Sequence, residues 1–232
     1  MRTGYNPLVY AVHVPEQIEA DLFKQGLGRI SAERRLKISK FHFQMDKNRS
    51  LLAELLVRKV LRDVFVIPEL EICFRTGSHG KPYLTKSGPF FNVSHAGEWV
   101  AAIFHSHEAG IDIEQLRSID TRIASRFFNP RESAALADLE EHNRLRQFYR
   151  LWTMKEAYIK ASGKGLSTPL DSFTFQPEGD EVYRYRVYEK DSQTEGRIQL
   201  IEWIEPYTCA VCVITPFQRI EPIILQTYNL WE

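Results

Sequence analysis

Cysteine is scarce in this chain of 232 residues, which contains only Cys73, Cys209 and Cys212. An odd number of cysteines without framework spacing excludes a disulfide-stabilised secreted scaffold and indicates a reducing compartment. Cys209 and Cys212 form a C-x-x-C, but they lie in the β-branched run 209–215, which predicts a buried strand. Residues three apart on a strand face opposite sides of the sheet, so core packing is favoured over metal or redox chemistry.

Long apolar runs are also missing. No stretch reaches the roughly 18 apolar residues that a membrane-spanning helix needs, and the first residues lack the apolar core of a signal peptide. We therefore expect a cytoplasmic protein without a membrane partner. The formal net charge is zero, which argues against a dedicated nucleic-acid-binding protein.

The charge is nevertheless unevenly distributed. Residues 24–63 hold eleven Lys or Arg against four acidic residues. A solvated helix face explains this excess, and a binding surface for a small, highly phosphorylated ligand explains it equally well.

The apolar periodicity predicts two halves of mixed helix and strand, packed tightly as an α+β pair. In the first half, Ser31 begins a helix and a longer buried helix covers about 46–65. Turn residues and β-branched runs predict the strands. The expected strands are 8–14, 72–76, 90–94, 100–105, 111–114, 173–175, 183–188, 198–204 and 209–214, with helices across about 119–161.

The segment Gly110-Ile111-Asp112-Ile113-Glu114 is the most informative one. On a strand, Asp112 and Glu114 share the face opposite the two isoleucines, with attachment points about 7 Å apart. Two converging carboxylates repel unless a cation neutralises them, and an oxygen-ligated ion such as magnesium suits them. Alternating acids on a solvated strand face are the ordinary alternative.

A second segment places Trp152, Glu156 and Lys160 four residues apart, on one stripe of a helix. An aromatic platform, a carboxylate and an ammonium would thus face the same side. Taken alone, this is also the pattern of an ordinary surface ion pair.

Two further segments offer anion contacts. Phe91 to His95 is a strand that ends in Ser94 and His95 before Gly97, and it supplies a hydroxyl, an imidazole and free backbone donors. The turn Gly80-Lys81-Pro82 holds an ammonium rigidly, although a plain turn has the same sequence.

In this order and spacing, the four segments closely resemble the Sfp-type 4′-phosphopantetheinyl transferases, over about residues 31–172. These enzymes modify carrier proteins of peptide, polyketide and sometimes fatty-acid synthesis, including the nonribosomal synthesis of antibiotics. The resemblance implies a pseudo-twofold arrangement of two similar α+β halves, residues 1–107 and 108–232, with the active cleft between them. It also implies a monomer, because the short members of the superfamily need trimers.

The resemblance further implies the roles of individual residues. Asp112, Glu114 and Glu156 correspond to the magnesium ligands, and Ser94, His95 and Lys160 to the contacts of the coenzyme A diphosphate. Lys81 and Arg49 correspond to residues at the adenosine end. Arg34, where relatives often carry Lys, and Lys37 correspond to contacts of the 3′-phosphate.

The implied reaction transfers 4′-phosphopantetheine from coenzyme A to a serine of an apo-peptidyl or acyl carrier domain and releases 3′,5′-ADP. Phosphoryl transfer depends mainly on positioning and charge neutralisation, which three carboxylates, magnesium, Lys160 and His95 would supply. Asp112 and Glu156 are catalytic in this scheme: Glu156 is the candidate base, and Lys160 is its rival.

The carrier is expected to dock near the cleft mouth. Ile119, Ile123, Phe127 and Phe128 recur at helical spacing and form either an exposed contact face or ordinary core. Two other functions compete with transfer. A non-catalytic module for coenzyme A or a nucleotide would keep the basic residues without needing three acids, and a metal-dependent hydrolase would pass the diphosphate to water.

Overall fold

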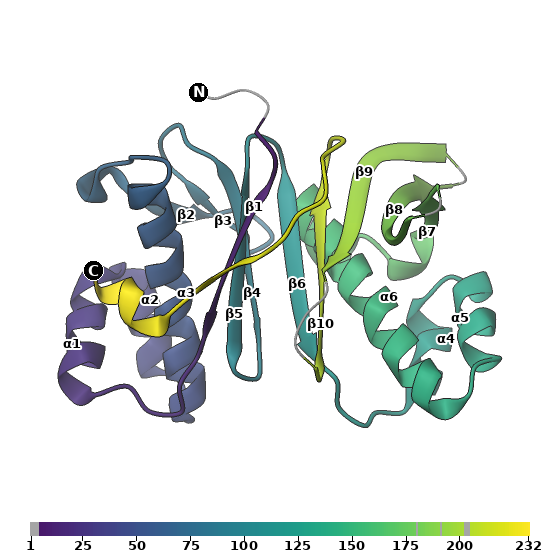
Figure 1. Cartoon of the computed structure of the whole chain (residues 1–232), viewed down its shortest axis with the longest axis horizontal. Coiled ribbons are helices and arrows are strands. Elements are labelled where there is room, and N and C mark those ends of the chain that lie inside the picture. Colours follow the sequence, from purple (N-terminus) through teal and green to yellow (C-terminus); the bar gives the residue numbers. More distant parts are fainter. Residues whose placement is uncertain (1–4, 180, 191, 202–204) are drawn as a thin grey trace.

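The computed structural model describes residues 5–179, 181–190, 192–201 and 205–232. Two β-sheets lie in the centre, and helices cover the outer face of each one (Figure 1). The expected α+β class with two sheet-containing halves is therefore confirmed.

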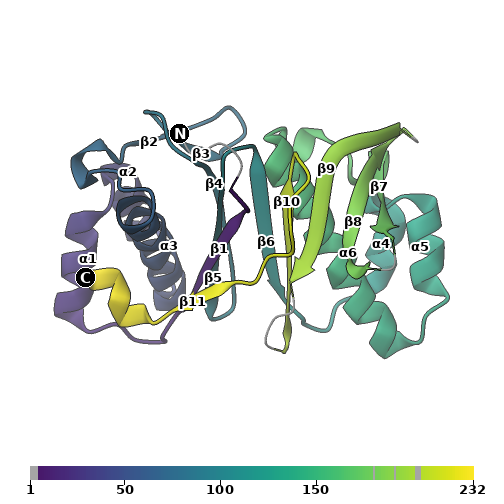
Figure 2. The same cartoon turned by 45° about the horizontal axis from the view of Figure 1, so that its top comes forward.

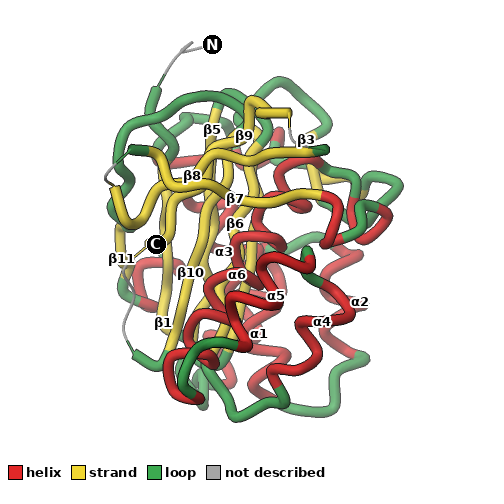
Figure 3. The backbone as a smooth tube through the Cα atoms, turned by 90° about the vertical axis from the view of Figure 1, so that its right-hand side faces the viewer, coloured by secondary structure: helices red, strands yellow, loops and turns green. Residues whose placement is uncertain are grey.

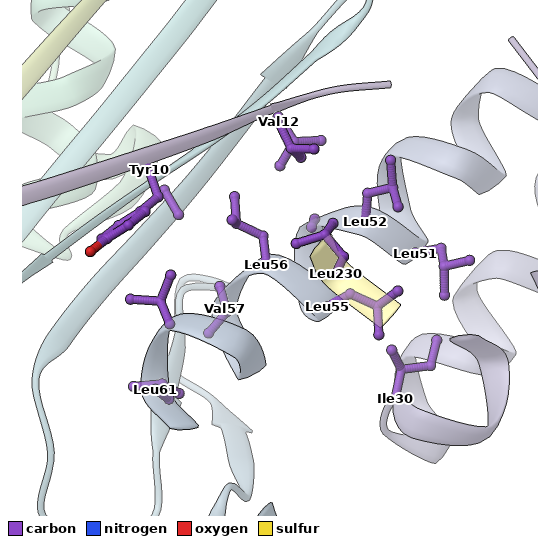
Figure 4. Close-up of a cluster of buried hydrophobic side chains, with 14 of the residues drawn as sticks. Tyr10, Val12, Ile30, Leu51, Leu52, Leu55, Leu56, Val57, Leu61 and Leu230 are labelled. Atoms are coloured by element: carbon purple, nitrogen blue, oxygen red, sulfur yellow. The ribbon is translucent and has the colours of Figure 1, made fainter. Parts of the chain in front are cut away.

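The first half contains a sheet in the order β11-β1-β5-β4 and a separate β2-β3 hairpin. Its elements are β1 (Leu8–His13), α1 (Ala20–Arg29), α2 (Ala32–Ser39), α3 (Gln44–Asp63), the 3-10 turn η1 (Glu69–Glu71), β2 (Phe74–Thr76), β3 (Pro82–Leu84), β4 (Phe90–Ala96) and β5 (Trp99–His105). The leucines of α3 pack against Tyr10 and Val12 of β1 and form the core of this half (Figure 4). The expected helix at 46–65 is thus the central helix of the first half.

The second half contains a sheet in the order β6-β10-β9-β8-β7. Its elements are β6 (Ala109–Gln115), η2 (Thr121–Ile123), α4 (Ala124–Phe127), α5 (Pro130–Ala137), α6 (Glu141–Ser162), η3 (Gly165–Ser167), η4 (Leu170–Ser172), β7 (Phe173–Glu178), β8 (Glu181–Glu189), β9 (Ser192–Ile201) and β10 (Tyr207–Val213). The strand expected at 198–204 is part of β9, and residues 202–204 lie outside the described residues. Seen from the side of this half, α5 lies next to the long helix α6 (Figure 3).

A separate core lies between the two sheets. Val9 and Ala11 of β1 face the second sheet, whereas Tyr10 and Val12 face α3, as the period of two on a strand requires. Cys209 contacts the core between the sheets and Cys212 contacts the core under α6. The prediction that the two cysteines face opposite sides is therefore confirmed.

The end of the chain returns to the first half. β11 (Ile223–Leu225) pairs in parallel with β1, and η5 (Thr227–Trp231) packs beside α3 (Figure 2). Two side-chain amides hold the crossing segment: Gln199 donates to the carbonyl of Ile220 and accepts from its N–H, while Asn6 pairs with Gln218 and Arg219. The chain thus crosses between the halves a second time near its end.

Candidate active site

The site lies where the edge strands of the two sheets meet. β4 ends the first sheet and β6 ends the second, and the two strands run side by side. Their link is made by side chains: the N–H of Ile111 donates to Oδ1 of Asn92, and the N–H of Ile113 donates to Oγ of Ser94. Polar residues at alternate positions of β4 therefore satisfy backbone donors of β6 that would otherwise be buried without partners.

Gly110 lets the helix α6 approach β6 closely. A Cβ atom at this position would lie 2.1 Å from the carbonyl oxygen of Ala157 and 2.4 Å from the N of Ala161. Only glycine allows this separation, which brings the last turns of α6 onto the strand that carries the acids. The glycine of the Gly110–Glu114 segment thus has a direct role in forming the site.

Asp112 is the centre of the polar cluster. Its Oδ1 accepts a hydrogen bond from Ser94 Oγ at 2.9 Å and forms an ion pair with Lys160 Nζ at 2.5 Å. Its side chain is buried, with the residue 3% exposed, so the alternative of an acid on a solvated strand face is wrong for this residue. Helix α6 covers this face of the strand because Gly110 permits the close contact.

Glu114 and Glu156 are half-buried beside Asp112. Burial raises the pKa of Glu114 to about 7, and repulsion from Asp112 adds to the effect, while Lys160 and a hydrogen bond from Trp152 oppose it. The pKa of Glu156 is also raised, by burial and by Asp112, against an opposing contribution from Lys160. The three acids and the lysine of the two motifs therefore interact electrostatically.

The chemistry of these side chains fits a magnesium ion. The second carboxylate oxygen of Asp112, Oδ2, is buried and has no hydrogen-bond partner within the described part of the chain. Carboxylate oxygens are the ligands that magnesium prefers, and a cation would relieve the repulsion among the three acids. Among the described residues no group of three His, Cys, Asp or Glu side chains is gathered for a metal ion, and Lys160 is the cation that contacts Asp112.

A basic wall faces the acids from the first half. Arg49 of α3 donates to the carbonyl of Gly97 and pairs with Asp46, each at 2.6 Å, which places its guanidinium beside the β4–β5 turn. His95 keeps an exposed surface at the end of β4, but the surrounding protein lowers its pKa to about 4, with repulsion from Arg49, Lys160 and Lys37 adding to the shift. Lys37, exposed on α2, therefore belongs to the same positive region.

The buried carboxylate of Glu54 fixes the position of Arg34. Ser31 caps α2 by accepting from the N–H of Arg34, and Glu54 accepts from both the N–H and the hydroxyl of Ser31. The same Glu54 lies 3.5 Å from Nε of Arg34 and pairs with Arg58. The start of α2, with Arg34 as one of the two predicted phosphate contacts, is thereby fixed to α3.

Lys81 bridges the two halves. Its ammonium pairs with Glu108 at 2.9 Å and donates to the carbonyls of Ala109 and Ala161. The residues beside it, Gly80 and Pro82, line a pocket of about 290 Å³ that also reaches Glu156 and Lys160. Lys81 thus lies between the start of β6 and the end of α6, beside this pocket. Its ammonium contacts Glu108 and two backbone carbonyls, and it does not contact Lys160.

A larger, mainly apolar groove of about 800 Å³ begins at Glu114. Ile119 and Ile123 line it from one side, and Phe148 and Trp152 of α6 from the other. Phe127 is exposed nearby, whereas Phe128 is buried and packs against Phe148. Of the four predicted contact residues Ile119, Ile123, Phe127 and Phe128, the first three are thus exposed and Phe128 belongs to the core.

Sequence reasoning missed Asn92 and Glu54 as parts of the site's support. Asn92 lies within the segment Phe91 to His95, two residues before Ser94. This spacing alone does not reveal that its side chain accepts a hydrogen bond from the backbone of another strand. Glu54 appeared only as one acid in a basic stretch. Their partners are far away in the sequence, so no local pattern indicated the contacts.

The fold and the site define an α+β protein of two sheet-containing halves, with acids, lysines, an arginine and a histidine gathered where the edge strands of the two sheets meet. A family model described as 4′-phosphopantetheinyl transferase superfamily matches residues 108–212, and one described as 4′-phosphopantetheinyl transferase, N-terminal, matches residues 17–107. The chain belongs to the 4′-phosphopantetheinyl transferase superfamily.

Curated relatives agree with this assignment over most of the chain. The 4′-phosphopantetheinyl transferase gsp of Aneurinibacillus migulanus is 36% identical over 87% of this chain and 83% of its own length. The 4′-phosphopantetheinyl transferase Sfp of Bacillus subtilis (strain 168) is 34% identical over 90% of this chain and 92% of its own. The enzyme psf-1 of Bacillus pumilus is 36% identical over 87% and 86%.

Proposed function

We propose that this protein transfers the 4′-phosphopantetheine group of coenzyme A to a serine of an apo-peptidyl or acyl carrier domain. The observation that carries this proposal is the buried Asp112–Lys160–Ser94 cluster beside Glu114 and Glu156, at the seam of a chain that belongs to this transferase superfamily. The serine oxygen forms a bond to the β-phosphorus, and the bond from that phosphorus to the bridging oxygen breaks. 3′,5′-ADP leaves with the electron pair.

Coenzyme A is proposed to lie along the seam. Lys160, Ser94 and His95 would contact its diphosphate, because they end the two elements that meet there. Arg34 and Lys37 on α2 would bind the 3′-phosphate, with Arg49 and Lys81 toward the adenosine. Supporting this arrangement, the charges of Lys37, Arg49 and Lys160 all act on His95, so these side chains bound one region.

Magnesium would be held by Asp112, Glu114 and Glu156. When bound, it would neutralise the negative charge that develops on the diphosphate oxygens. Lys160 would then point its ammonium at the phosphates, since its present partner Asp112 would share its charge with the ion.

Glu156 is the proposed base for the carrier serine. Burial raises its pKa, which favours proton uptake, and among the described residues no side-chain hydrogen bond to its carboxylate is found. Lys160, the rival, is ion-paired with Asp112 and serves better as a cation that contacts phosphate.

The apolar groove at residues 119–123 is proposed to receive the carrier domain. It opens directly at Glu114 and is lined by Trp152, so a serine delivered there arrives beside the acids. A monomeric, cytoplasmic protein is a prediction from the sequence; no helix in the described ranges is long and apolar enough to cross a membrane.

The transfer is tested by incubating the protein with coenzyme A, magnesium and an apo-peptidyl carrier, and then measuring the carrier mass. We expect a gain of one phosphopantetheine and stoichiometric 3′,5′-ADP. An unchanged carrier with intact coenzyme A would indicate a binding module, and 3′,5′-ADP without carrier modification would indicate a hydrolase. The relatives are all named as transferases, which favours neither alternative.

Asp112→Asn gives a second test of the site. We expect loss of transfer together with a lower melting temperature, because removing one partner of a buried ion pair costs about 3–5 kcal/mol. Asp21→Asn, a matched change at an exposed position of α1, should leave both unchanged. Normal carrier modification by Asp112→Asn would overturn the proposed metal site.

A further inference from the structure

Lys155 of α6 is fully buried, with 0% exposure, although it adjoins the functional Glu156. Its ammonium donates to the carbonyls of Leu170 and Phe173 at 2.8 and 2.9 Å and pairs with Glu132 at 2.8 Å. An ammonium has three donors, and these three partners use all of them. The lysine is therefore fixed in one position and is not available to a ligand.

Glu132 carries the connection onward to the start of α5. The oxygen that pairs with Lys155, Oε2, also accepts the N–H of Asn129 at 3.2 Å, and the Asn129 side chain in turn caps α5. The neighbouring Phe128 lies under the Lys155 ammonium at 5.5 Å and stacks on Phe148 of α6. One carboxylate oxygen thus joins α6 to the turn between α4 and α5.

This turn directly follows one wall of the apolar groove. Ile123 and Arg126 line the groove just before it, while the other wall is formed by Phe148 and Trp152 of α6. The two walls belong to different elements, and the ion pair lies behind them. Apolar contacts alone would let the two groove walls slide past each other. A buried ion pair with fixed hydrogen bonds instead holds the walls at one distance.

We propose that the Lys155–Glu132 pair positions the groove wall of residues 119–128 against Trp152 and Glu156, and so sets where the carrier serine arrives. The inference rests on the proposed function, because it assigns the groove to the carrier. Lys155 and Glu132 are positioning residues, since neither contacts the acidic cluster or the 290 Å³ pocket.

The test compares Glu132→Gln and the double variant Lys155→Met, Glu132→Gln with the wild type. The double variant leaves no unpaired buried charge, and such replacements of buried pairs generally retain the fold. We expect the KM for the carrier to rise about tenfold or more, with the Kd for 3′,5′-ADP within about twofold of wild type. The control is the double variant Arg131→Met, Glu140→Gln. Arg131 is exposed at the start of α5 and Glu140 is exposed at the start of α6, so this variant should change neither value.

A second measurement is independent of the carrier. Hydrogen exchange of the amides at 119–128 should be faster in Glu132→Gln, while exchange at 152–160 stays as in the wild type. An unchanged carrier KM in a folded double variant would overturn the inference, as would equal losses of 3′,5′-ADP and carrier binding. If the wild type itself fails to modify any carrier, the proposed function fails, and the exchange experiment still decides whether the pair holds the wall.

Discussion

The charge state of His95 follows from its surroundings in the ligand-free protein. The protein atoms around its ring displace water, and this desolvation together with repulsion from three nearby cations lowers its pKa to about 4, so the imidazole is neutral at pH 7. A bound phosphate would cancel much of this repulsion and raise the pKa. We therefore expect binding of 3′,5′-ADP to take up a proton between the raised pKa and about 4, and to tighten as the pH falls through the raised pKa toward about 4.

The His95 titration is measured by NMR of the ring protons, with and without 3′,5′-ADP. His42, an exposed histidine of the first half, is the internal reference. A His95 midpoint that does not rise on binding would contradict its proposed diphosphate contact.

As a proposed magnesium ligand, Glu114 would make the affinity for this ion depend on pH. A carboxylate must lose its proton to bind a metal ion, and the pKa of Glu114 is raised to about 7. Affinity should therefore fall about tenfold for each pH unit below 7 and level off above it. Isothermal titration with Mg²⁺ between pH 5.5 and 8 measures this, and Glu114→Gln should bind weakly at every pH. Affinity that stays constant across this range would contradict a role for Glu114 as ligand.

At the scale of elements, the contact between β6 and α6 decides whether the acids meet the lysine. Gly110→Ala places a Cβ within 2.1 Å of a backbone oxygen of α6, so the helix must move away. We expect transfer activity to fall at least about a hundredfold as Lys160 leaves Asp112, with a reduced melting temperature.

Gly28→Ala is the matched control for this substitution. Gly28 lies in α1 with no atom within 4 Å of a Cβ, and alanine should stabilise the helix by about 0.5–1 kcal/mol. Activity and melting temperature are measured for both variants. Full activity of Gly110→Ala would show that the close contact is not required.

The sequence predicted most elements because apolar periodicity and turn residues are local signals. The helix at 46–65 and the strand at 111–114 are found within a few residues of α3 and β6. The helix α1 was missed because its polar face dominates and two glycines interrupt it. The burial of Asp112 was missed because it depends on α6, which begins about thirty residues later.

The candidate site was predicted through its motifs, and the structure brings Ser94, Asp112 and Lys160 into direct contact. Their contact joins three elements, and only the whole fold specifies it. The support of the site by Asn92 and Glu132 could not be predicted, since each acts on a partner in another element.

At the scale of the whole molecule, the C-terminal tail, residues 223–231, is expected to stabilise the first half. Leu230 is fully buried in the core with α3 (Figure 4), and Leu230→Ala should lower the free energy of unfolding by about 2–5 kcal/mol. Urea denaturation measures the change. Tyr228→Ala, at an exposed position of the same turn, should cost less than about 0.5 kcal/mol. Equal stability of the two variants would show that the tail only rests on the surface.

The same tail has a consequence for synthesis on the ribosome. The chain emerges from its N-terminus, and β11 begins more than a hundred residues after β5 ends, so β1 and β5 leave the ribosome before their partner β11 has been translated. Until then one side of β1 is an open edge, which invites pairing with other nascent chains. A chain released before Ile223 would keep that edge uncovered, and premature termination should therefore yield aggregates instead of a half-active enzyme.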